Sequence, residues 1–124
     1  MNFFENIELE NYRNFNKYSI IFSNKCNVII GPNGSGKTNI LESMSLFEKG
    51  RGFRKDNFNN MINNKNLEKM FFINSSFITE KINLNLLLYC ELIENRLKKK
   101  IFVNDSNSKD SLKYFDQLYS FIYF

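Results

Sequence analysis

The sequence predicts an α/β fold, in which a glycine-rich loop leads into a helix and most of the strands are antiparallel. Three observations predict it. The octapeptide at 31–38, GPNGSGKT, lies between a continuous apolar run at 28–30 and an amphipathic segment that opens at residue 39. Three segments with strand-like alternation follow one another between residues 70 and 103. A further segment, 108–118, carries apolar residues at helical spacing.

Residues 1–55 are expected to hold two antiparallel strands, the glycine-rich loop and the first helix. Residues 7–10 alternate apolar and acidic, and residues 18–22 repeat the alternation after a polar turn around Arg13 and Asn14. The run Val28-Ile29-Ile30 is apolar throughout, which is typical of a strand covered on both faces in a mixed or parallel sheet.

The helix is predicted from Lys37 onward. Its apolar residues recur every three or four positions and form a stripe that packs on the sheet, namely Ile40, Leu41, Met44 and Phe47. Gly50 is the expected C-terminal cap, because glycine adopts the left-handed conformation found there.

The octapeptide matches the phosphate-binding loop G-x-x-x-x-G-K-[S/T], in the strand-loop-helix context that this loop requires. Inward-turned backbone N–H groups hold a triphosphate, and glycines allow the close approach. The lysine supplies charge to the outer phosphates, and the threonine hydroxyl suits a magnesium ion. A glycine-rich turn that binds nothing is the alternative, and it does not require Lys37 and Thr38 together. The predicted site is Gly31, Pro32, Asn33, Gly34, Ser35, Gly36, Lys37 and Thr38, with Thr38 as the metal ligand.

The segment 70–103 is predicted to be an antiparallel β subdomain, with short turns between its strands. Its last strand carries the densest basic run of the chain, Arg96 to Lys100, with Lys98 and Lys100 pointing outward. Such lysines either protect an exposed strand edge or contact phosphates. Residues 108–118 are the predicted helix, and 119–124 the start of a further strand. An apolar strand at the end favours a fragment of a longer protein, the alternative being a genuine terminal strand in the sheet.

The amino-acid composition limits the range of possible functions. The 124 residues carry a formal net charge of +4 and no histidine, which excludes imidazole bases and histidine-ligated zinc. Cys26 and Cys90 lack metal-like spacing and are typical of reduced thiols in a cytosolic protein. No signal peptide or membrane span is expected.

Glu91 follows an apolar segment and is a candidate magnesium-site acid, as in a small kinase. However, the alternation at residues 82–88 favours an ordinary antiparallel strand.

Three segments carry a resemblance to a known family: LENYRNF at 9–15, residues 27–42 with the octapeptide, and GRGFR at 50–54. Many ATPase families share the phosphate-binding loop. The segments at 9–15 and 50–54 are what distinguish one family among them. The chain resembles the RecF family of DNA replication and repair proteins, within the SMC and ABC-type ATPases. The resemblance spans essentially the whole chain and is strong through Arg54.

The resemblance implies that residues 1–124 form the N-terminal, ATP-binding lobe of an ABC/SMC-type P-loop ATPase head, truncated before the signature motif and Walker B acids. It implies ATP and Mg²⁺ as cofactors and binding to single-stranded or gapped DNA. It further implies recombinational repair with RecO and RecR, SOS induction, an ATP-dependent homodimer, and a cytoplasmic, nucleoid-associated location without a membrane partner. The family is a weak DNA-dependent ATPase. We expect this chain to bind ATP without turning it over.

Four further residues are carried over from the family. Arg13 and Asn14 are expected near the nucleotide, or else form a locally hydrogen-bonded turn. Arg51 and Arg54 are expected either to contact DNA phosphates or to support the lobe. The alternative functions are a small P-loop kinase that acts on a metabolite through Glu91, another SMC/ABC-type ATPase fragment, and a nucleotide-dependent DNA-binding module with no chemistry of its own.

Overall fold

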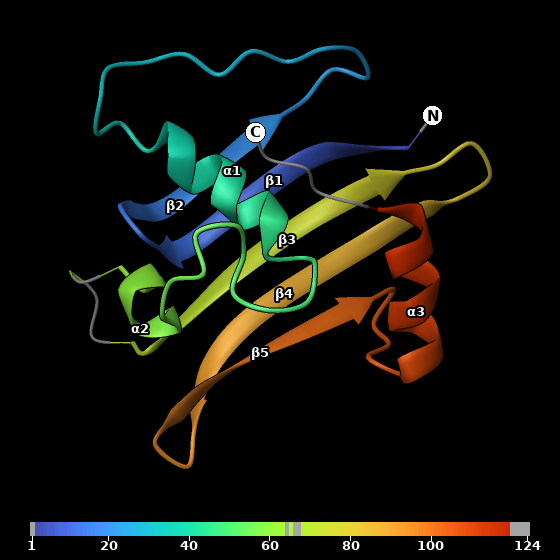
Figure 1. The fold of residues 1–124 in the computed structure, drawn as a ribbon. Coiled ribbons are helices and arrows are strands. Elements are labelled where there is room, and N and C mark those ends of the chain that lie inside the picture. The colour runs from blue at the N-terminus through green and yellow to red at the C-terminus, as the bar shows by residue number, and fades with distance from the viewer. Residues whose placement is uncertain (1, 64, 66–67, 120–124) are drawn as a thin grey trace.

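The computed structural model describes residues 2–63, 65 and 68–119, whose strands form one five-stranded antiparallel sheet (Figure 1). The strands are β1 (Phe3–Tyr12), β2 (Phe15–Ile21), β3 (Met70–Ile78), β4 (Asn83–Ile93) and β5 (Arg96–Val103). The helices are α1 (Lys37–Ser45), α2 (Phe58–Met61) and α3 (Lys109–Leu118). The order across the sheet is β2-β1-β3-β4-β5, and every neighbouring pair is antiparallel.

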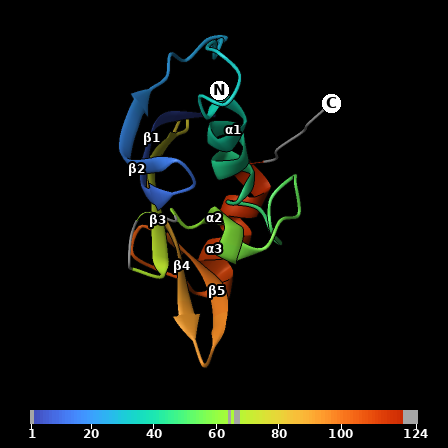
Figure 2. The same ribbon diagram turned by 90° about the vertical axis from the view of Figure 1, so that its left-hand side faces the viewer.

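The helices all lie on one face of the sheet, as Figure 2 shows. The inward-facing residues of the strands alternate with outward-facing ones, so that Ile7, Ile73 and Leu88 are fully buried. Phe47, after α1, and Phe115, on α3, cover them from above and complete one apolar core.

The predicted antiparallel meander of β3, β4 and β5 is present, and it continues the sheet that β1 and β2 begin. In the pairing of β1 with β3, Ile7 lies opposite Ser75 and Leu9 lies opposite Ile73. Residues 1–55 and 70–103 therefore share one sheet and one core. Their division into a nucleotide-binding part and a β subdomain stays a prediction.

The prediction of a buried strand at Val28–Ile30 is wrong. The segment pairs with none of the five strands, and Val28 and Ile30 are 79% and 84% exposed. A central strand needs a backbone partner on each side. Here β2 ends at Ile21 on the sheet edge, and the chain leaves in a wide arc before it returns as α1 (Figure 1).

Gly50 does not cap α1, which ends at Ser45 with Leu46 as the C-cap residue. The hydroxyls of Ser43 and Ser45 donate to the carbonyls of Ile40 and Glu42, at 2.6 and 2.7 Å. Serine hydroxyls that bind nearby helix carbonyls compete with the backbone ladder, which favours an early end to the helix. Gly50 lies farther on, in the following loop, with φ of 94°.

The basic run of β5 is divided between the two faces of the sheet. Lys98 is exposed, whereas Lys99 points toward the helices and donates from Nζ to the carbonyls of Leu46, Glu48 and Gly50, at 2.8, 2.6 and 2.6 Å. Burial lowers the pKa of Lys99 to about 8, so the ammonium keeps its charge at neutral pH. Lys99 is therefore a structural cap for the end of α1.

α3 begins after Ser108, whose hydroxyl accepts a hydrogen bond from the Ser111 backbone N–H at 3.1 Å. Tyr119 follows the helix and packs its ring on Phe4 and Phe115. The rest of the strand predicted at 119–124 lies outside the described residues. Within the described ranges, no helix has the length and apolar character needed to cross a membrane.

Candidate nucleotide-binding site

The glycine-rich loop lies between the end of β2 and the first turn of α1, with most of its residues exposed. Gly34 and Gly36 have φ of 83° and 101°, in the left-handed region that glycine adopts without strain. A Cβ on Gly36 would lie 2.7 Å from Phe15 Cζ and 2.9 Å from Asn14 Nδ2. The β1–β2 turn therefore packs directly on the loop, and only glycine fits at position 36.

The two residues after Gly36 open the helix. Lys37 turns back along the loop, and its Nζ donates to the carbonyl of Gly31. Thr38 is exposed. Among the described residues, no side chain caps the N-terminus of α1, so its first N–H groups and the positive end of the helix dipole face the loop. These donors suit a phosphate group.

Asn14 connects the β1–β2 turn to both parts of this site. Its Nδ2 donates to the carbonyl of Ser35 at 3.4 Å, and its Oδ1 accepts from Asn39 Nδ2 at 2.9 Å. Asn14 thus holds the loop and the first turn of α1 together.

Arg13 binds carboxylates. Its Nε and Nη2 donate to the two carboxylate oxygens of Glu42, at 2.8 and 2.7 Å, and Nη2 also lies 3.0 Å from Asp56 Oδ2. Burial alone would lower the pKa of Arg13, but hydrogen bonding to Glu42 and its charge outweigh burial and raise it. Arg13 is therefore a permanently charged link between the β1–β2 turn, α1 and the loop before α2.

Glu42 is the centre of this network and is fully buried on α1. The Tyr12 hydroxyl also donates to its carboxylate, and Arg54 Nη1 lies 3.8 Å away. Burial, followed by the charge of Glu42, raises the pKa of Tyr12, so the phenol keeps its proton and remains a donor. Sequence reasoning assigned no role to Glu42, Tyr12 or Asp56, because no local pattern pairs residues about thirty positions apart.

The two predicted DNA-contacting arginines lie in the loop after α1. Arg51 is exposed, and its Nη1 donates to Asn57 Oδ1 at 3.2 Å. Arg54 is turned partly inward, with its guanidinium carbon 6.0 Å from the centre of the Phe53 ring and Nη1 toward Glu42. Arg54 is therefore partly engaged by Glu42, and for both residues the choice between contact with DNA and support of the lobe stays a prediction.

A polar cavity of about 420 Å³ opens beside the loop, between the β1–β2 turn, α1 and α2. Carboxamide side chains dominate its lining, which consists of Arg13, Asn14, Asn39, Asn59, Asn60 and Ile62. The structure thus brings the predicted pair Arg13 and Asn14 to the wall of a cavity next to the predicted phosphate site.

The kinase alternative requires Glu91 on a parallel strand beside Val28–Ile30. β4 instead lies between β3 and β5, antiparallel to both, and the Glu91 carboxylate lies 3.9 Å from Lys100 Nζ. This arrangement contradicts the kinase alternative. Among the described residues, no group of three or more carboxylates and cysteines is placed to hold a metal ion.

Comparison with known proteins identifies the family. The family described as the RecF/RecN/SMC N terminal domain matches residues 3–115. The chain belongs to this family. The predicted resemblance to RecF is confirmed by the DNA replication and repair proteins RecF of two Francisella tularensis subspecies, mediasiatica (strain FSC147) and novicida (strain U112). Each is 36% identical over 84 residues, or 68% of this chain and 24% of the relative. The chain thus spans about a quarter of these relatives.

Solved structures confirm the predicted P-loop ATPase head fold. The recombination mediator protein RecF-ATPrS in the RecFOR pathway matches 87% of this chain and 28% of its own, with a TM-score of 0.73 and 26% identity. The SMC head domain from Thermotoga maritima matches 94% of this chain and 42% of its own, with a TM-score of 0.68 and 21% identity, and supports the fold alone.

Proposed function

We propose that this chain is the ATP-binding part of a RecF-type DNA replication and repair ATPase. The observation that carries the proposal is the fit between the loop and a phosphate chain. Position 36 is packed closely against Phe15 and Asn14, the N-terminus of α1 is uncapped, and the Lys37 ammonium lies at the Gly31 carbonyl at the start of the loop. A bare turn would not require these donors together.

Each loop residue has a proposed role. The backbone N–H groups of 34–38 bind phosphate oxygens, and Lys37 exchanges its bond with the Gly31 carbonyl for the outer phosphates. The exposed Thr38 hydroxyl is the proposed protein ligand of Mg²⁺. When bound, the ion neutralises charge between the phosphates.

The polar cavity is the proposed place for the nucleoside. Its carboxamides offer both donors and acceptors, which suits the edge of a base or the hydroxyls of a ribose. Asn14 and Arg13 are then close to the nucleotide. Arg13 positions α1 through its bonds to Glu42, and Lys37 is the proposed phosphate-binding residue.

The role in DNA repair rests on the family and on the relatives named RecF. We propose that the complete protein binds single-stranded or gapped DNA, dimerises around ATP and acts with RecO and RecR in recombinational repair and SOS induction. It would do so in the cytoplasm, at the nucleoid. Arg51 is the better placed of the two arginines to contact a phosphate, because Arg54 Nη1 is directed toward Glu42. Another SMC-type head remains the alternative, given the Thermotoga maritima structure.

Isothermal titration of the chain with Mg-ATP tests the ATP-binding proposal. Lys37→Ala is expected to weaken binding at least about tenfold, because the outer phosphates lose a charge-assisted bond. Lys55→Ala removes an exposed lysine of the loop after α1 and serves as the matched control. Equal affinity in the wild type and Lys37→Ala would contradict the phosphate-binding assignment. No phosphate release is expected from any of the three, since the only acid predicted for the magnesium site, Glu91, is paired with Lys100 in the sheet.

A further inference from the structure

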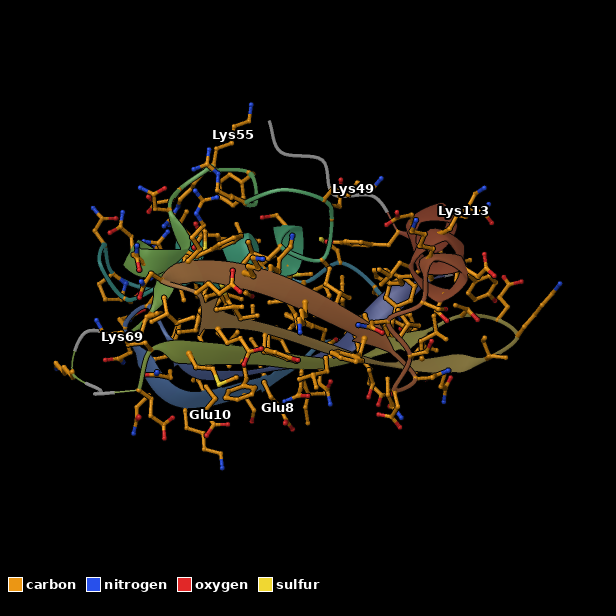
Figure 3. All side chains as sticks on the ribbon, turned by 90° about the horizontal axis from the view of Figure 1, so that it is seen from below. Glu8, Glu10, Lys49, Lys55, Lys69 and Lys113 are labelled. Atoms are coloured by element: carbon orange, nitrogen blue, oxygen red, sulfur yellow. The ribbon has the colours of Figure 1, made fainter. Side chains whose placement is uncertain are left out.

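The outer face of the sheet, opposite the helices, is the surface of interest. The described helices leave it uncovered (Figure 2), and in Figure 3 Glu8 and Glu10 point away from it on the side opposite the helices. A sheet face in water normally carries polar side chains. β1 and β2 follow this rule, with Glu8 opposite Ser19 and Glu10 opposite Lys17.

β3, β4 and β5 depart from it. Their outer faces bring together Phe72, Tyr89 and Phe102, here called the outer aromatic row. Phe72 lies directly opposite Tyr89, and Phe102 lies opposite Leu87, two residues from Tyr89 on the same face. The ring centroids are 6.2 Å apart between Phe72 and Tyr89 and 5.8 Å apart between Tyr89 and Phe102. All three residues are half-buried, so part of each ring is open to solvent.

Charge is distributed unevenly around this row. Lys98 and Lys100 lie on β5, the edge strand, with Lys100 opposite Tyr89. Their acidic neighbour Glu91 lies opposite Lys98 in the strand pairing and 3.9 Å from Lys100 Nζ, so one carboxylate does not balance the charge of the two lysines. At the other end of the row, Glu10 lies opposite Phe72. A polyanion would therefore be accepted on the β5 side of the row.

We propose that the outer aromatic row is a stacking platform for the bases of single-stranded DNA, with Lys98 and Lys100 at its phosphates. Aromatic side chains on a sheet stack unpaired bases, whatever their sequence, because every base has a π face. The ring separations exceed the spacing of about 3.4 Å along one strand of a duplex, so they suit bases that have come apart. The inference rests on the proposed function and assigns DNA a place distant from the nucleotide site.

The test is titration of the 124-residue chain with fluorescein-labelled oligo-dT and with a duplex of equal length. Tyr89→Ala and Phe102→Ala are each expected to weaken oligo-dT binding about tenfold. Tyr89→Phe keeps the ring and is expected to bind within about twofold of the wild type, and Asn74→Ala is the control on the same face outside the row. With two phosphate contacts, the logarithm of the affinity should fall with the logarithm of the salt concentration with a slope of about −1.4. Lys98→Ala should lower that slope by half.

Fluorescence gives a second readout that does not depend on the alanine variants being folded. The chain has no tryptophan, so its emission comes from tyrosine. Oligo-dT is expected to quench this emission in the wild type and to quench it less in Tyr89→Phe.

Two outcomes would overturn the proposal: oligo-dT affinity unchanged in both alanine variants, or equal binding of the duplex. Mg-ATP binding, measured on the same samples, separates this inference from the proposed function. A chain that binds ATP but not oligo-dT contradicts the platform alone, and loss of ATP binding with oligo-dT binding intact contradicts the nucleotide site alone.

Discussion

The two ends of α1 differ in how their backbone groups are satisfied. At the C-terminal end, Lys99 Nζ binds three carbonyls, and the Tyr119 hydroxyl donates to the Met44 carbonyl at 2.6 Å. At the N-terminal end, Gly36 is the cap residue, and no side chain among the described residues binds the free N–H groups. A helix end without partners costs stability. The difference teaches that α1 is fixed by its far end and middle, which leaves the loop end available for a ligand.

The largest effect is expected in the middle of the helix, where Glu42→Ala should lower the free energy of unfolding by about 3–5 kcal/mol. The substitution removes the fully buried carboxylate that Arg13 and Tyr12 share, so Arg13 is left with Asp56 and the buried Tyr12 hydroxyl loses its acceptor. Urea unfolding followed by circular dichroism measures it, with the exposed Glu8→Ala as the control. A loss as small as that of the control would mean that Glu42 does not fix α1.

The next effect is expected at the C-terminal end. Lys99→Met keeps the apolar stem but leaves three carbonyls without their donor, at a cost of about 1–3 kcal/mol. The same unfolding experiment applies, with Lys98→Met on the adjacent exposed residue as the control. If the two substitutions cost the same, Lys99 is not the anchor of this end.

At the loop end, Gly36→Ala is expected to cost about 1–2 kcal/mol for left-handed backbone, together with the displacement of Phe15. Gly34→Ala separates the two causes, because its φ is also positive and no atom lies within 4 Å of the added Cβ. In thermal unfolding, Gly36→Ala should therefore have a lower melting temperature than Gly34→Ala. The opposite ranking would show that the β1–β2 turn does not pack on the loop.

The smallest effect on stability is expected for Lys37→Ala, within about 0.5 kcal/mol of the wild type, although it should remove most of the ATP affinity. Among the described residues, the Lys37 ammonium donates to the Gly31 carbonyl, in an exposed position. Unfolding measured with and without Mg-ATP checks both statements, because the ligand should stabilise the wild type and not the variant. A large loss without ligand would make Lys37 a structural residue.

Local patterns were sufficient for much of the fold and for the loop. Alternation predicted β3, β4 and β5, and the motif at 31–38 identified the glycine-rich loop that precedes α1. The apolar run at 28–30 led to the wrong prediction of a buried strand. Apolar residues indicate that a segment favours burial, but they do not show which other segments pack against it. The sequence also could not show that β3 pairs with β1, since that register depends on contacts between distant segments.

The site was predictable only where its chemistry is continuous in the chain. Residues 31–38 could be read directly, whereas the Glu42 network joins Tyr12, Arg13 and Arg54 through folding alone. Lys99 was concealed inside a run of lysines. Its inward position follows from the alternation of β5, which places it on the same face as Leu97 and Ile101.

The capping of α1 by Lys99 also sets an order of events during synthesis. The helix lies between β2 and β3 in the chain, yet its anchor comes from β5, 53 residues after Leu46. Closing so long a loop is slow compared with forming the helix itself. During synthesis, the phosphate-binding loop and α1 therefore leave the ribosome well before β5, the strand whose Lys99 stabilises the end of α1. ATP affinity is expected to appear only after β5 has emerged, and it would then report completion of the sheet.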